Sequence, residues 1–169
     1  MKPTCSLKAG VTAALAGLFL VGAQQALAGQ VDVQYLKADE YTDAGRGRDL
    51  EQVESALTAH LRQLGAAALP ANQTLGIEVL DIDLAGDIRP WRRVWPDVRV
   101  MRGNTDWPRI SLRFTLREGD KVLSTAEDAV ADMAYLFGGR SWGLHQSEYL
   151  YYEKRMLSDW FAKRFVPAH

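Results

Sequence analysis

A serine between two glycines is the first candidate for chemistry in this sequence. Residues 139–143 read Gly-Arg-Ser-Trp-Gly and match the G-x-S-x-G pattern of a nucleophile elbow, where a sharp turn exposes the serine hydroxyl. Such an elbow stands on a buried parallel strand within a large α/β sheet, for which this chain is too short. We therefore expect residues 139–143 to form a glycine-rich turn before the last helix.

Three aspartates lie close together in the middle of the chain. Asp81, Asp83 and Asp87 resemble the start of a calcium-binding loop. The pattern then fails, because Ala85 occupies a ligand position and Arg92 stands where a bidentate glutamate is required. We expect Asp81 and Asp83 to lie at a strand end instead, where they accept hydrogen bonds from loop amides or pair with arginine.

The histidines do not form a metal site in the sequence. His60 lies on the apolar stripe of a predicted helix, where a hydrogen-bonded core or rim histidine is expected. His145 and Glu148 are three residues apart, but no second histidine follows them on the predicted final helix. The only cysteine is Cys5, which precedes the mature domain, so a closed zinc site is not expected. We predict no metal and no cofactor.

Glu153 is the most unusual charged residue of the chain. At 100° per residue it falls in the centre of an apolar stripe on the final helix, formed by Tyr149, Tyr152, Met156, Leu157, Trp160 and Phe161. A carboxylate buried there must find a partner or lose its charge. We predict an ion pair with an arginine of the sheet, Arg99 or Arg113. The alternative is a carboxyl group of raised pKa that does acid–base work.

Arginine and tryptophan side chains form the candidate binding surface. Alternation places Arg109, Arg113 and Arg117 on one face of a strand, and Arg99 is expected to join them. The sequence also predicts a basic, aromatic loop that contains Trp91, Arg92, Arg93 and Trp95. These residue types suit a sugar, an anionic group or a protein partner. The alternative is a solvated face with cross-strand ion pairs to Glu78 or Glu127.

Periodicity predicts the elements that must position these residues. Alternating apolar residues predict strands at 31–35, 75–84, 98–100, 110–116 and 122–130, with a bulge near Val79 and a hairpin turn at 118–120. Helical spacing predicts helices at 50–64 and 146–165, the first with Asp49 and Gln52 as a capping box and Gly65 as its stop. The order predicts a two-layer α+β domain, with two amphipathic helices on one face of a mostly antiparallel sheet.

The first 28 residues read as a cleavable secretory signal. Lys2 and Lys8 precede an apolar run of about 15 residues, short of the roughly 20 that a spanning helix needs. Residues 26–28 read Ala-Leu-Ala, a small-x-small site that predicts cleavage before Gly29. Residues 29–169 are then one domain, with 18 basic and 21 acidic side chains. That balance argues against general nucleic-acid binding, and we expect a periplasmic or secreted protein without a stable membrane anchor.

Five short segments resemble those of a family of exported bacterial proteins, the domain-of-unknown-function family 3016. The matching segments are 41–43, 81–86, 98–101, 132–136 and 152–157, the last followed by Trp160 and Phe161. They run through nearly the whole mature chain, so the resemblance covers a full domain. It implies export from a bacterial cell and assigns no activity or catalytic residue.

These observations favour a non-enzymatic envelope protein that binds an envelope protein or an anionic ligand through the arginine face and the tryptophan loop. The alternative is a small hydrolase or lyase that uses Glu153, or Asp81 and Asp83. The two differ in one respect, because an enzyme needs a concave pocket that holds a carboxyl group of perturbed pKa. A binding module needs only an exposed aromatic and basic patch.

Overall fold

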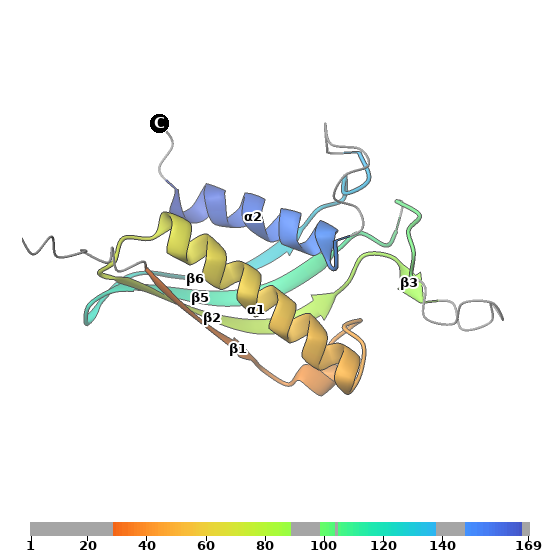
Figure 1. The fold of residues 1–169 in the computed structure, drawn as a ribbon, viewed down its shortest axis with the longest axis horizontal. Helices are drawn as coiled ribbons and strands as arrows, with labels where there is room; N and C mark the ends of the chain where they lie inside the picture. The colour runs from red at the N-terminus through yellow and green to blue at the C-terminus, as the bar shows by residue number, and fades with distance from the viewer. Residues whose placement is uncertain (1–28, 89–98, 104, 138–147, 167–169) are drawn as a thin grey trace, which may run out of the picture.

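The structure is a computed structural model that describes residues 29–88, 99–103, 105–137 and 148–166. Within these residues, a sheet of four strands has the order β1-β2-β5-β6. The strands are β1 (Gln30–Tyr35), β2 (Gln73–Asp83), β5 (Arg109–Glu118) and β6 (Lys121–Ala131). β1 pairs in parallel with β2, and the other pairs are antiparallel. Helices α1 (Arg48–Ala68) and α2 (Tyr151–Phe165) cover one face (Figure 1). The predicted two-layer α+β architecture is confirmed.

The core lies between the two helices and the sheet. Alternate side chains along β2 and β5 face the helices, and buried apolar side chains of both helices pack onto them. The largest fully buried core side chains are Leu57, Leu61, Leu75, Ile77, Ile82, Ile110, Leu112, Leu157 and Phe161. None of the helices within the described residues has the length and apolar content that a bilayer-spanning helix needs.

The predicted irregularity of β2 is confirmed. The register against β5 shifts between Val79 and Asp81, so Leu75, Ile77 and Val79 are buried before the shift and Ile82 after it. The extra residue shifts the inward-facing positions from odd to even residue numbers, so the strand continues to bury apolar side chains. The predicted turn at 118–120 is also confirmed, because β5 and β6 form a hairpin there with Gly119 at a φ of 55°.

Both predicted signals at the ends of α1 are wrong. The helix begins after Gly47, and no side chain caps it, so Asp49 and Gln52 do not form a capping box. Gly65 lies inside the helix, which continues to Ala68. A Cβ atom at Gly65 would lie 2.1 Å from Cγ2 of Val31 in β1. Glycine is therefore required there by the close packing of α1 on β1, and not by the end of the helix.

The remaining segments extend beyond the main sheet. β3 (Asp87–Ile88) and β4 (Arg99–Val100) form a separate antiparallel pair. The strand predicted at 98–100 therefore lies outside the main sheet, and residue 98 lies outside the described residues. A single 3-10 turn, η1 (Ala38–Glu40), follows β1. Helix α2 starts at Tyr151, later than predicted, because Leu150 adopts a left-handed conformation with φ 57°.

Candidate functional site

A cavity of about 470 Å³ lies where the first turns of both helices meet the small β3–β4 sheet. α1 contributes Asp49, Gln52 and Val53, and a second wall is the segment from Glu148 to Glu153, which leads into the first turn of α2. The remaining lining residues are Ala44 and Gly45 in the loop after β1, Leu84 and Ala85 just after β2, and Ile88, Arg99 and Met101 at the small sheet. Its volume is within the range of small-molecule sites, about 300–1,000 Å³.

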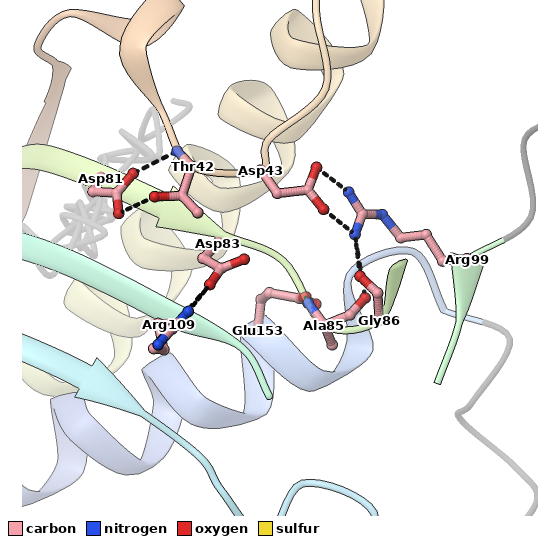
Figure 2. Close-up of polar contacts among 9 residues, drawn as sticks. All are labelled: Thr42, Asp43, Asp81, Asp83, Ala85, Gly86, Arg99, Arg109 and Glu153. Carbon is pink, nitrogen blue, oxygen red and sulfur yellow. Dashed lines mark hydrogen bonds and ion pairs between the residues drawn. The ribbon is translucent and has the colours of Figure 1, made fainter. Parts of the chain in front are cut away.

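Glu153 lines this cavity and is 3% exposed. Its burial confirms the position predicted from the helical stripe. The Ala85 amide donates a hydrogen bond of 2.8 Å to Oε1 of Glu153 (Figure 2). Burial raises the pKa of this carboxyl above its ordinary value, and the amide of Ala85, the residue's own amide and the charge of Arg99 oppose that rise. Glu153 therefore ties the first turn of α2 to the loop after β2.

The predicted ion pair between Glu153 and an arginine is wrong. Arg99 donates from Nη1 and Nη2 to the Asp43 carboxylate, at 2.9 and 2.8 Å, and Nη1 also donates to the carbonyl oxygen of Gly86 at 2.8 Å (Figure 2). Arg113 is half exposed and pairs with Glu78 and Glu127. Arg99 acts on Glu153 only through its charge. No ion pair reaches Glu153 from any part of the chain that the structure describes.

Backbone pairing positions Asp43 at this point. Asp43 forms an isolated parallel bridge with Asp83, in which the amide of Asp43 donates to the carbonyl of Ile82 and the amide of Leu84 donates to the carbonyl of Asp43. The loop after β1 thereby extends along the end of β2. Its carboxylate then faces Arg99 across the end of the sheet (Figure 2).

The aspartates of β2 have the structural roles expected for them. The amide and hydroxyl of Thr42 donate to Asp81, at 2.7 and 2.9 Å, and Asp83 pairs with Arg109 (Figure 2). Asp87, which would continue a calcium loop, lies 3.5 Å from Arg102. Among the described residues, no group of three carboxylate, histidine or cysteine side chains is arranged to hold a metal ion.

The contacts of the arginine face are those expected of a solvated sheet face with cross-strand ion pairs. Arg109 pairs with Asp83 and lies 5.7 Å from the ring of Trp107, Arg113 bridges two neighbouring strands, and Arg117 is exposed near the hairpin turn. Arg99 does not join this face, because it belongs to the small β3–β4 sheet. The tryptophan loop at 91–95, the G-x-S-x-G segment at 139–143 and His145 lie outside the described residues.

His60 links the two helices. Its Nε2 lies 2.9 Å from the carbonyl oxygen of Lys154 and 2.9 Å from Oγ of Ser158, both on α2. Burial lowers the pKa of the imidazole below its ordinary value. The residue is half buried and hydrogen-bonded, as expected for a rim histidine.

Tyr149 is a site residue that the sequence analysis misplaced on the helical stripe. It precedes α2, is 50% exposed and lines the cavity. Burial raises the pKa of its phenol, the charges of Asp49 and Glu153 raise it further, and that of Arg99 lowers it. Tyr149 therefore shares the lining of the cavity with Asp49, Arg99 and Glu153. The dense run of tyrosines just before Glu153 is the signal in the sequence that marks this place.

The fold and the cavity define a class of protein: a small α+β domain with a carboxylate-containing pocket at one end of its helical layer. The chain belongs to the family described as protein of unknown function (DUF3016), whose model matches residues 29–163. This confirms the resemblance seen in the sequence. Comparisons with curated proteins and with solved structures give no match.

Proposed function

We propose that the domain binds a small ligand in the cavity between the two helix starts, without transforming it. One observation carries the proposal: a carboxyl group that is 97% buried lines an open cavity and has no cation paired with it among the described residues. Burying a charge without a partner is unfavourable. A ligand that supplies the missing partner of Glu153 offsets that penalty. This gives a reason for a carboxyl group in this position.

The cavity replaces the arginine face as the preferred binding site. Arg113 already contacts two carboxylates, and exposed pairs of this kind are common on solvated sheets. An interaction of the tryptophan loop or of Arg117 with an envelope protein stays a separate proposal. The leader-like residues 1–28 support a periplasmic or secreted location for the domain.

Acid–base catalysis by Glu153 is the second candidate function. It is favoured by the raised pKa of a carboxyl group in a cavity, which is the property expected of a general acid. Asp81 and Asp83 do not line this cavity, and both are held by Thr42 or Arg109. Binding is preferred because, among the described lining residues, no side chain contacts Glu153 as a nucleophile or a second acid would.

A fragment screen with two matched tryptophan variants tests the proposal. Ile88 lines the cavity and is 45% exposed, so Ile88→Trp narrows the cavity without disturbing the core. Val122 is 47% exposed on β6, away from the cavity, and Val122→Trp is the control. We expect ligand-observed NMR to detect fragments that bind the wild type and Val122→Trp but not Ile88→Trp. Equal binding of fragments to all three proteins, or no binding at all, would refute the binding proposal. Chemical conversion of a bound fragment would support catalysis instead.

A further inference from the structure

The charges around the cavity are not balanced. Arg99 is compensated by the two-pronged contact with Asp43, and Glu148 pairs with Lys154 at 2.7 Å. Asp49 and Glu153 also line the cavity, and neither has an ion pair among the residues that the structure describes. The uncompensated charge of the lining is therefore negative.

The rest of the lining is apolar and aromatic. Leu84 is buried, whereas Ile88 and Met101 are large hydrophobic side chains that stay 45% and 36% exposed beside the cavity. Tyr149 lines the cavity together with Asp49 and Glu153 and presents half of its surface to solvent. An occupant that covered Ile88 and Met101 would remove their apolar surface from water.

From this arrangement we infer that the cavity takes an organic cation: an ammonium group attached to an apolar body. The inference rests on the proposed function and names the chemical class of its ligand. The ammonium group lies between Asp49 and Glu153, and the apolar body contacts Leu84, Ile88 and Met101. An ammonium ion supplies the counter-charge that Glu153 lacks, and an aromatic ring such as Tyr149 attracts cations. Among the described lining residues an anion finds no equivalent group, because the guanidinium of Arg99 already binds Asp43.

Three probes with the same eight-carbon body separate the head group from the body. Octylamine is an ammonium ion at neutral pH, octanoate is an anion, and octanol is neutral. Isothermal titration of the purified protein, below the concentration at which the probes aggregate, gives their dissociation constants. We expect octylamine to bind more than about tenfold more tightly than octanoate, because a buried charge pair contributes strongly to affinity.

Two variants then test the named carboxylates. Glu153→Gln and Asp49→Asn should each weaken octylamine binding, by more than about tenfold for Glu153→Gln, and leave octanol binding unchanged. Asp49 is exposed, so its variant tests the inference even if Glu153→Gln unfolds. Octanoate or octanol binding as tightly as octylamine overturns the cation inference and leaves the proposed function intact. Failure of all three probes to bind counts against both.

Discussion

Replacing Glu153 by glutamine separates a buried ion pair from a carboxyl group of raised pKa. Breaking an ion pair inside a protein leaves an unpaired charge and destabilises by about 3–5 kcal/mol. Glu153 has no such pair within the described part of the chain, and Oε1 of a glutamine can still accept the hydrogen bond from the Ala85 amide. Loss of the charge weakens that bond by about 1 kcal/mol, whereas relief from burying the charge offsets at least as much. We expect Glu153→Gln to be as stable as wild type at pH 7, or more stable.

The difference in stability between the wild type and Glu153→Gln should depend on pH in a defined direction. The folded-state pKa of Glu153 is raised, so the unfolded chain loses this proton first as the pH rises above about 4.3. The stability that the proton contributes is present below that pH and is lost as the pH rises through the folded pKa. The urea midpoint of the wild type should therefore fall relative to that of Glu153→Gln across this window, and the two should converge in acid.

Two further variants control the experiment. Glu153→Leu removes the acceptor and leaves the buried Ala85 amide without its partner, at a cost of about 1–3 kcal/mol. Glu127→Gln removes one exposed carboxylate on β6 and should change stability by less than about 1 kcal/mol. If Glu153→Gln loses 3 kcal/mol or more at pH 7 while Glu127→Gln does not, the charge of Glu153 is stabilising and this reasoning is refuted.

Three other experiments have expected outcomes. Gly65→Ala should destabilise by about 1–3 kcal/mol in urea melts because its Cβ would overlap Val31, and Val31→Ala should recover part of that loss; independent effects of the two changes would contradict the packing. Arg164 lowers the pKa of Asp128, so stability should fall with pH below about 3.9, and Asp128→Asn should flatten that fall in acid urea melts; an unchanged slope would exclude the role. Amino-terminal sequencing of the exported protein should begin at Gly29, whereas an intact leader in the membrane fraction would indicate an anchor.

The sequence was sufficient for most of the fold because the relevant signals are local. Alternation predicted the strands, and the change of phase after Val79 predicted the bulge that the pairing of β2 with β5 contains. Helical spacing also predicted that Glu153 would be buried. The role of Gly65 could not be found this way, because the same glycine ends a helix or permits close packing, and only the position of Val31 distinguishes the two.

The candidate site depends on contacts between distant segments, which periodicity does not describe. Arg99 and its partner Asp43 are 56 residues apart, and an isolated bridge to β2 brings Asp43 into place. The cavity exists because the first turns of α1 and α2 lie beside the same loop. Helical spacing therefore identified Glu153, but it could not show that Arg99 pairs with Asp43 instead.

The contact between Arg99 and Asp43 has a consequence for how the wall of the cavity responds to salt. It holds the small β3–β4 sheet to the loop after β1, and both of its side chains are partly exposed, at 18% and 35%. Dissolved ions screen such a contact only weakly, because its atoms are 2.8 Å apart, within the Debye length of about 3 Å at 1 M salt. The pairs of Arg113 with Glu78 and Glu127 are more exposed and contribute little at high salt. The wall of the cavity therefore keeps its attachment to the loop after β1 at ionic strengths that weaken the ion pairs of the open sheet face.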